Sequence, residues 1–317
     1  MDYFPLVTIG IPNYNYANYI IDSINSVLNQ TYPNIELIIV DDFSKDNSVA
    51  VIDQFIHTYQ GYIKIKFIRN KVNGGLTKVC NQILEAAKGK YFQTLDADDL
   101  LLPDKIGKQV KLMEVKEDVA IVYSNVAVID EKGSVISEDY LYRVGYDKNN
   151  MPQDNVFEKL FYFNFIPLPS VLVNTNYARH VGGFDENLQV QDYYLWLKLA
   201  EQYNVVFMNE QTALYRVHEA SMSNSNKTNP ASIASVLDIK FRYFKSVNDT
   251  IKKEIKKNIY NSVPYLYEFK FPSAKYWIKQ NLLLNPGIKS LGYYVAIKLG
   301  IQFSYLNNIK SLLGIFR

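Results

Sequence analysis

The chain has 317 residues, of which 48% are hydrophobic, which is enough for one large domain or two with a substantial core. Its 34 basic and 32 acidic residues leave a net charge of only +2, which argues against nucleic acid or a highly acidic partner, and the single cysteine, Cys80, excludes an internal disulfide. The start lacks a basic and apolar leader, and no stretch approaches the roughly 20 apolar residues of a membrane span, so we expect a cytoplasmic protein without a transmembrane helix.

The first hundred residues alternate short β-branched runs with helical patterns. They predict four strands, at residues 6–11, 35–40, 63–68 and 91–95. Between them we expect a helix with Ile20 and Ile24 on its apolar face, a second helix capped by residues 44–46, and a third that ends at a C′ glycine, Gly89. This order predicts a parallel sheet with helices on both faces.

The pattern of predicted strands and helices changes from about residue 119. We expect shorter strands and one helix that begins at Asp192, followed by a polar run at residues 221–229 and a mainly helical stretch to the end. The polar segment 138–152 is expected to be a mobile loop. The shorter strands are predicted at residues 119–123, 126–129, 170–173, 205–207 and 213–216.

An acidic run, Leu95-Asp96-Ala97-Asp98-Asp99, stands at the end of the fourth predicted strand. So many like charges are costly unless a cation lies among them, and oxygen ligands suit Mg²⁺ or Mn²⁺, which leave positions open for substrate phosphates. The alternative is a solvated turn that caps the helix beginning near Asp104. Residues 12–15 and the pair Asp41-Asp42 also follow strands, and the carboxyl ends of parallel strands meet at one edge, where ligands bind.

Taken together, these segments resemble the GT-A glycosyltransferases of family 2, which are inverting enzymes that use nucleotide-activated sugars. The likeness covers roughly residues 5–225. It rests on motifs in family order at residues 7–15, 36–48, 73–75 with Asn81, 90–103, 182–185, 191–197 and 215–221. The fold that this implies is a Rossmann-like mixed sheet flanked by helices, with a catalytic domain at 1–225 (nucleotide-binding half 1–100, acceptor half 101–225) and a C-terminal helical extension at 226–317.

The resemblance assigns a role to each matching residue. It implies that Pro12, Tyr14 and Asp41 hold the base and ribose of the nucleotide, usually UDP, that Asp96 contacts the ribose, and that Asp98 binds the metal. His218 would lie near the diphosphate or the metal, and Asn81 and Ala97 would line the donor site. Taken alone, His218 could equally be an ordinary hydrogen-bonded histidine, and Tyr14 a core aromatic residue.

Asp192 matches the family's catalytic base, the group that takes the proton of the acceptor hydroxyl. The alternative is that Asp192 is only the N-cap of the helix that it begins. The family often has a carboxylate on each side of this position, where the chain has Gln191 and Tyr194. We therefore expect the loss of two negative charges to lower the pKa of Asp192.

The C-terminal stretch carries Leu291, Tyr294, Ile297 and Ile301 at helical spacing, among lysines. One interpretation is a helix that lies peripherally at the inner face of the cell membrane, and the other, which we favour, is packing on protein, including a second subunit.

The sequence thus predicts a metal-dependent inverting glycosyltransferase that moves a sugar from a nucleotide diphosphate to a saccharide or a lipid-linked saccharide, in bacterial surface-polysaccharide synthesis. The alternative from another class is a catalytically inactive GT-A module that binds nucleotide-sugar or saccharide as an assembly partner. A nucleotidyltransferase would need a Gly-rich basic loop after the first strand, and residues 12–15 are not such a loop.

Overall fold

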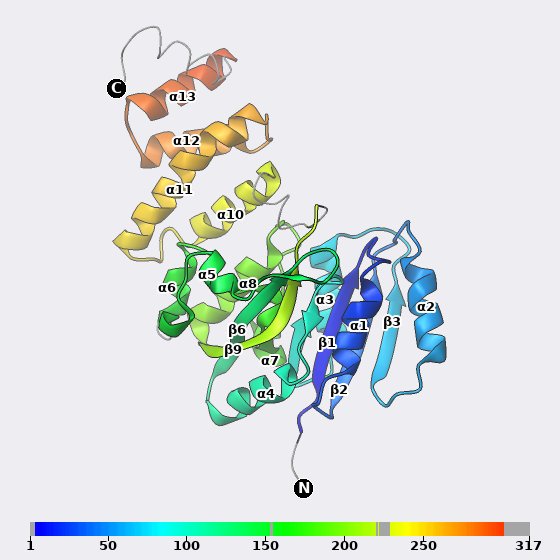
Figure 1. Ribbon diagram of the computed structural model, residues 1–317. Coiled ribbons are helices and arrows are strands. Elements are labelled where there is room, and N and C mark those ends of the chain that lie inside the picture. Colours follow the sequence, from blue (N-terminus) through cyan, green and yellow to red (C-terminus); the bar gives the residue numbers. More distant parts are fainter. Residues whose placement is uncertain (1–3, 153–154, 220, 222–228, 301–317) are drawn as a thin grey trace. The chain divides into compact units, whose positions relative to one another are not determined.

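The computed structural model describes residues 4–152, 155–219, 221 and 229–300 (Figure 1). The chain divides into two compact units, Met1–Ser221 and Met222–Arg317. Within the described ranges, we find no helix with the length and hydropathy that a membrane crossing requires. Most of the expected linker at 221–229, and Ile301, lie outside the described residues.

The first unit is built on one mixed sheet in the order β3-β2-β1-β4-β8-β6-β9-β5, and β7 pairs with β6. Its first part is parallel, because β1 pairs with β2 and β4 in parallel and β2 with β3; β8 then runs antiparallel to β4 and β6. The strands are β1 Val7–Asn13, β2 Ile35–Asp41, β3 Lys64–Arg69, β4 Tyr91–Thr94, β5 Leu100–Leu101, β6 Val119–Ile129, β7 Val135–Ser137, β8 Leu172–Asn174 and β9 Asn204–Arg216.

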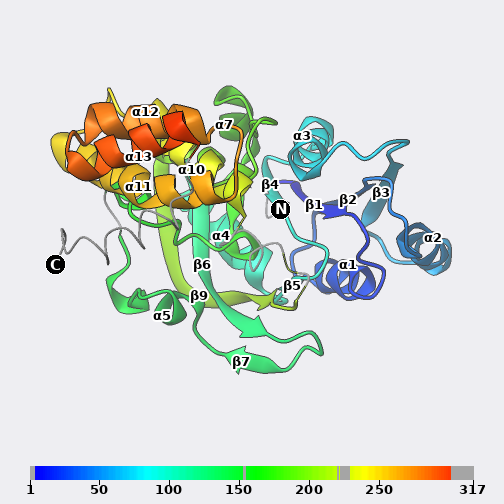
Figure 2. The same ribbon diagram turned by 90° about the horizontal axis from the view of Figure 1, so that it is seen from above.

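Helices cover both faces of this sheet. They are α1 Ile20–Leu28, α2 Ser48–Thr58, α3 Leu76–Ala86, α4 Lys105–Val115, α5 Tyr140–Arg143, α6 Val156–Leu160, α7 Thr175–His180 and α8 Gln191–Gln202, with short 3-10 turns at Lys148–Asn150 (η1) and Leu168–Ser170 (η2). Figure 2 shows α1 and α3 on opposite faces of β1 and β2.

Alternation along β2 explains this layering. Leu37 and Ile39 pack with Ile20 and Ile24 of α1 in one core, whereas Ile38 joins a second core that contains Val79 and Ile83 of α3. Gly10 of β1 lets α3 come close, because a Cβ at this position would overlap the side chain of Ile83. The expected fold class, a mixed sheet flanked by helices, is confirmed.

Several sequence-based boundaries are wrong. The polar pair Ser124-Asn125 does not separate two strands but lies at register shifts inside β6, and β9 is likewise continuous from Asn204 to Arg216. The N-cap position of α2 is Asn47, whose side chain makes no capping bond; Asp46, one of the expected capping residues, accepts from the backbone N–H of Ser48 at 2.9 Å. The third helix ends at Ala86, so Gly89 is not its C′ residue. The segment 138–152 contains α5 and η1, so it is not a structureless loop.

The second unit is helical over its described residues. Its helices are α10 Pro230–Arg242, α11 Asp249–Glu268, α12 Ala274–Leu284 and α13 Ile288–Leu299. α11 buries Ile251, Ile255 and Ile259, which stand one turn apart on a single face.

Candidate active site

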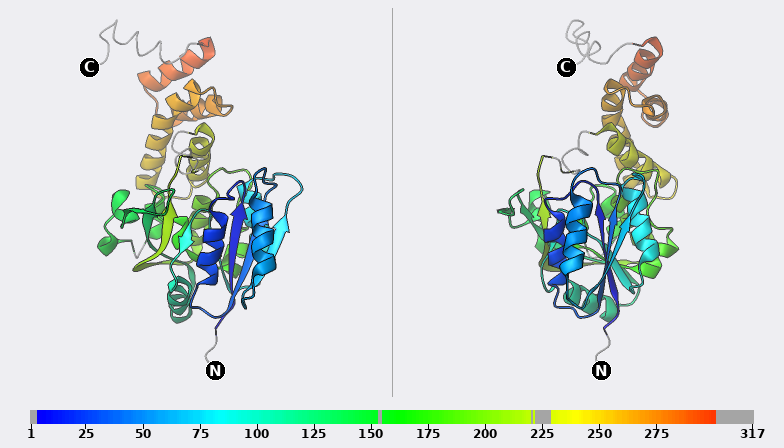
Figure 3. Two further views of the ribbon diagram at one scale, coloured as in Figure 1. Left: turned by 45° about the vertical axis from the view of Figure 1, so that its right-hand side comes forward. Right: turned by 90° about the vertical axis from the view of Figure 1, so that its right-hand side faces the viewer.

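The acidic run forms a tight turn between β4 and β5, at the carboxyl edge of the parallel strands. Figure 3 shows these strands, in blue, between helices on both sides. The backbone N–H of Asp99 donates to the carbonyl of Asp96 at 3.1 Å. One carboxylate oxygen from each of Asp96, Asp98 and Asp99 lies within 4.8 Å of the others. Asp98 and Asp99 are buried and Asp96 is partly exposed, so the turn presents three crowded carboxylates to one side.

Burial raises the pKa of all three carboxyl groups, and repulsion from neighbouring carboxylates adds to the rise for Asp96 and Asp99. Burial, together with the charges of Asp98 and Asp192, raises the pKa of Asp96 to about 8. Burial also raises the pKa of Asp99 well above its ordinary range. It raises the pKa of Asp98 as well, although His218 and Arg216 oppose that shift.

Oδ2 of Asp99 is buried and finds no hydrogen-bond partner among the described residues. Buried carboxylates that lack sufficient donors are stabilised by a hard divalent cation, for which carboxylate oxygens are preferred ligands. The cluster Asp96, Asp98 and Asp99 therefore fits Mg²⁺ or Mn²⁺. Of these three, sequence analysis proposed Asp98 alone as a metal ligand.

The end of β9 brings two basic side chains to the turn. The backbone N–H of Arg216 donates to Oδ1 of Asp99 at 2.8 Å, and its Nε donates to the carbonyl of Asp98 at 2.8 Å. Nε2 of His218 lies 3.0 Å from Oδ2 of Asp98. Tyr19 stacks on the His218 ring with centroids 5.1 Å apart. His218 is thus held beside Asp98 across 120 residues of chain, and its contact with a diphosphate or a metal stays a prediction.

Asp192 lies in the first turn of α8. Nδ2 of Asn164 donates to Oδ2 of Asp192 at 3.4 Å. The N-cap of α8 is Val190, so the N-cap interpretation of Asp192 is wrong. The sequence led us to expect a lowered pKa for Asp192, but its pKa is raised. Burial raises it by more than the missing neighbouring charges and the hydrogen bonds to the carboxylate lower it.

Asp192 also lies close enough to the acidic turn for its charge to act there. That charge raises the pKa of Asp96 and, on the other side, the pKa of Tyr140 in α5. Because such effects weaken with distance, β4, α5 and α8 converge on one region of the first unit. Tyr140 and Asn164 were missed by sequence analysis, since only the folded chain brings them to Asp192.

The residues proposed for the nucleotide lie nearby along the same edge, but two of them already have partners. Tyr14 follows β1 and is 42% exposed. Asp41 accepts from Nδ2 of Asn13 at 2.8 Å and from the Ser44 backbone and hydroxyl at 2.9 and 2.6 Å. Asn81 exchanges two hydrogen bonds of 3.0 Å with the backbone of Phe184. Pro12 and Ala97 are buried. Nucleotide contacts by these five residues stay predictions.

The neighbouring residue Asp42 holds the loop before α3 in place. Its carboxylate accepts from the backbone N–H groups of Gly74 and Gly75, the shortest at 2.7 Å, and from Nδ2 of Asn70 at 2.8 Å. These bonds fix the loop that leads into α3. All the donors that Asp42 needs come from the protein itself, so it is a structural residue.

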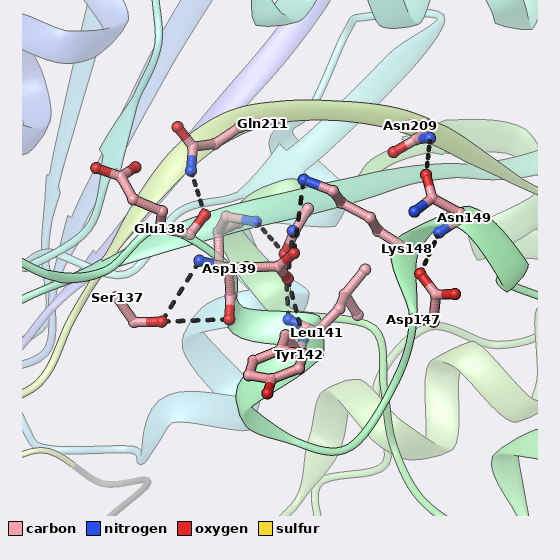
Figure 4. Close-up of polar contacts among 12 residues, drawn as sticks. Ser137, Glu138, Asp139, Leu141, Tyr142, Asp147, Lys148, Asn149, Asn209 and Gln211 are labelled. Carbon is pink, nitrogen blue, oxygen red and sulfur yellow. Dashed lines mark hydrogen bonds and ion pairs between the residues drawn. The ribbon is translucent and has the colours of Figure 1, made fainter.

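Figure 4 shows how α5 is anchored to the sheet. Asp139 caps the helix by accepting from the Tyr142 backbone N–H at 2.9 Å, and it also accepts from Nδ2 of Asn125 in β6 at 2.6 Å. Lys148 pairs with the other oxygen at 3.7 Å. Asp139 thereby holds the segment that carries Tyr140, and it was not predicted.

Comparisons with known proteins agree with this geometry. The model of glycosyl transferase family 2 matches residues 8–165. An uncharacterized glycosyltransferase of Rickettsia typhi is 33% identical over 232 residues, which cover 70% of this chain and 67% of that protein. The chondroitin synthase of Pasteurella multocida is 33% identical over 199 residues, covering 62% of this chain and 19% of the synthase.

Solved structures share the fold at low sequence identity. TarS residues 1–349 of S. aureus, in complex with UDP-GlcNAc, match with a TM-score of 0.61 and 13% identity, covering 93% of this chain and 92% of that one. A mannosyltransferase of Pyrobaculum calidifontis, in complex with GDP-Man and Mn²⁺, matches with a TM-score of 0.60 and 17% identity, covering 99% and 89%. These relatives and the family match lead to one conclusion: the chain is a GT-A glycosyltransferase and belongs to glycosyl transferase family 2.

Proposed function

We propose that this glycosyltransferase moves one sugar, with inversion, from a nucleoside diphosphate to a hydroxyl of a saccharide, and that it depends on a divalent cation. The observation that carries the proposal is the cluster of three carboxylates with an unpartnered buried oxygen, which suits Mn²⁺ or Mg²⁺ bound with a diphosphate. Asp98 and His218 would hold the ion together with the unpartnered oxygen of Asp99, and Asp96 would lie beside the ribose. When bound, the cation supplies positive charge that stabilises the leaving diphosphate.

We assign the donor to residues 1–100 and the acceptor to residues 101–225. Tyr14 would stack on the base, Pro12 and Asp41 would shape its pocket, and Asn81 and Ala97 would line it. Uridine is the base that we propose. The bound UDP-GlcNAc of one structural neighbour supports this choice, and the GDP-Man of another makes guanosine the competitor to test.

The proposed reaction needs one base and one leaving group. The acceptor oxygen attacks the anomeric carbon from the side opposite the diphosphate, and its proton passes to Asp192. The bond between the anomeric carbon and the phosphate oxygen breaks, and its electron pair leaves with the nucleoside diphosphate. Asn164 donates to one oxygen of Asp192 and so restrains the carboxylate, which makes Asn164 a positioning residue. An α-linked donor gives a β-linked product.

We propose a saccharide or a lipid-linked saccharide as the acceptor, in the assembly of a bacterial surface polysaccharide at the cytoplasmic side of the membrane. The match to a chondroitin synthase supports a sugar acceptor. Segments 138–152 and 155–165 would select it, because Asn164 donates to Asp192 and Tyr140 lies within range of its charge.

The test is release of nucleoside diphosphate from UDP- and GDP-sugars, with Mn²⁺ or with EDTA, by the wild type and by Asp192→Asn. We expect release from one donor class, only with the cation, and lost in the variant. No release from any donor, together with nucleotide-induced thermal stabilisation, would instead support the catalytically inactive binding module.

A further inference from the structure

The two units of the chain carry opposite charge. Residues 1–221 contain 19 Lys and Arg against 28 Asp and Glu, whereas the described residues 229–300 contain 12 Lys and Arg against 4 Asp and Glu. The near-neutral total therefore hides a strongly basic helical unit. A basic surface of this kind favours an anionic partner.

The last described helix, α13, has an apolar stripe on its solvent side. Ile288, Leu291, Val295 and Leu299 are 76%, 51%, 45% and 67% exposed. Their spacing of three, four and four residues puts them on one face of the helix. The stripe differs from the one expected from the sequence, which joined Leu291 to Tyr294, Ile297 and Ile301.

The opposite face of α13 makes its contacts within the unit. Ser290, Tyr293 and Ala296 are buried, and Nδ2 of Asn281 in α12 donates to the Ser290 hydroxyl at 3.2 Å. The helix is thus already held by its small and polar side, and the aliphatic stripe is left on the surface. Packing within the described unit does not account for that stripe.

Lysines border the stripe. Lys289 follows Ile288, and Lys298 precedes Leu299. The ammonium of Lys289 lies over the Tyr260 ring, 5.3 Å from its centroid. On α12, the exposed Lys275 and Lys279 accompany the exposed Tyr276 and Leu283. Aliphatic side chains flanked by lysines and tyrosines are suited to the boundary between acyl chains and charged headgroups of a bilayer.

We propose that α12 and α13 form a docking surface for an anionic phospholipid membrane, with the α13 stripe inserted at the interface and the lysines on the headgroups. Charge complementarity favours this occupant over a symmetric pairing of two copies, because that pairing would bring equally basic helices against these ones. The inference stands apart from the transfer reaction, since none of these residues belongs to the proposed active site. It would place the enzyme where lipid-linked acceptors reside.

The test is flotation of the full chain with phosphatidylglycerol/phosphatidylcholine vesicles and with pure phosphatidylcholine vesicles, at low and high salt. We expect binding to the anionic vesicles that falls as salt increases. Replacing Ile288, Leu291, Val295 and Leu299 by Gln should weaken binding at least tenfold by removing the inserted side chains. Replacing Lys275, Lys279, Lys289 and Lys298 by Gln should weaken it on the order of a hundredfold or more.

Matched controls lie in the first unit. Gln at the exposed Tyr62, Val72, Val115 and Val135 removes four comparable apolar side chains, and Gln at the exposed Lys64, Lys66 and Lys71 removes basic charge. Both should leave flotation unchanged, and circular dichroism would verify folding of every variant. Equal flotation of the wild type and the α13 variant would overturn the proposal. A second result would also overturn it: the wild type does not float, light scattering shows that it is a dimer, and the α13 variant is a monomer. The stripe would then join two copies of the chain.

Discussion

Two acidic groups stand at the ends of β2 and β4, on either side of β1 in the same sheet, and they differ in how many donors the protein gives them. Asp41 and Asp42 after β2 receive hydrogen bonds from Asn13, Ser44, Asn70, Gly74 and Gly75. In the turn after β4, Asp99 keeps a buried oxygen with no partner among the described residues, and burial raises the pKa of all three aspartates. Carboxylates that the protein satisfies hold loops in place, and those it leaves short of donors are available for a ligand.

The largest expected effect comes from Asp98→Asn in the donor-poor group. Without this carboxylate, the cation should no longer support nucleotide binding, and transfer should fall by roughly a thousandfold or more. Stability in metal-free buffer should not fall, because the change relieves repulsion among buried like charges. Transfer assays and thermal unfolding in EDTA check both parts, and a rate within tenfold of the wild type would contradict the metal assignment.

Asp192→Asn should separate chemistry from binding. The amide has the same shape but takes no proton, so turnover should fall by about 10²–10⁴ while nucleotide-induced stabilisation stays. Single-turnover kinetics with saturating donor measure the first quantity and thermal shift the second. Equal turnover by wild type and variant would remove the base assignment.

Asp42→Ala should affect stability. It leaves the N–H groups of Gly74 and Gly75 without their acceptor and removes one of the two acceptors of the Asn70 amide, which should cost about 2–4 kcal/mol in the free energy of unfolding. Urea unfolding measures this loss. Asp53→Ala is the control, because its exposed ion pair with Arg69 should contribute less than about 1 kcal/mol. Equal losses in the two variants would break the distinction between the acidic groups.

The smallest effect concerns pH. Asp192 must be ionised to accept a proton, so the rate should fall as pH decreases through a pKa that burial holds above the ordinary value of about 4. The Asn164 amide lowers this pKa, so Asn164→Ala should move the acid limb to higher pH. A profile of kcat against pH tests the sign, and a downward movement would show that Asn164 does not stabilise the carboxylate.

Local patterns predicted the strands and helices of the first hundred residues. Their β-α order is confirmed, because the nearly continuous apolar run of β2 reflects burial on both faces and the spacing of Ile20 and Ile24 reflects the buried face of α1. Polar residues misled the prediction inside β6, where Ser124 and Asn125 find partners in Thr212 and Asp139 instead of forming a turn. Those partners belong to other elements, which no local window contains.

The site could be predicted only where motifs carry it. Asp98 beside His218 follows from the family pattern, but the roles of Asp42 and Asn164 depend on contacts 32 and 28 residues away. Nothing local indicates that Lys105 is buried, with its ammonium donating to Gln93, Gln109 and the Val171 carbonyl at 2.5–2.8 Å. The direction of the Asp192 pKa was wrong because burial is a tertiary property.

The most direct test of the central claim is thermal unfolding of the wild type and Asp98→Asn with UDP, GDP, dTDP or CMP, each with Mn²⁺ or EDTA. Ligands that bind the native state raise the melting temperature. We predict a rise with one nucleotide class, in the wild type only, and only with the cation. Equal rises in EDTA, or in Asp98→Asn with Mn²⁺, would contradict a metal-nucleotide site at the Asp96–Asp99 turn.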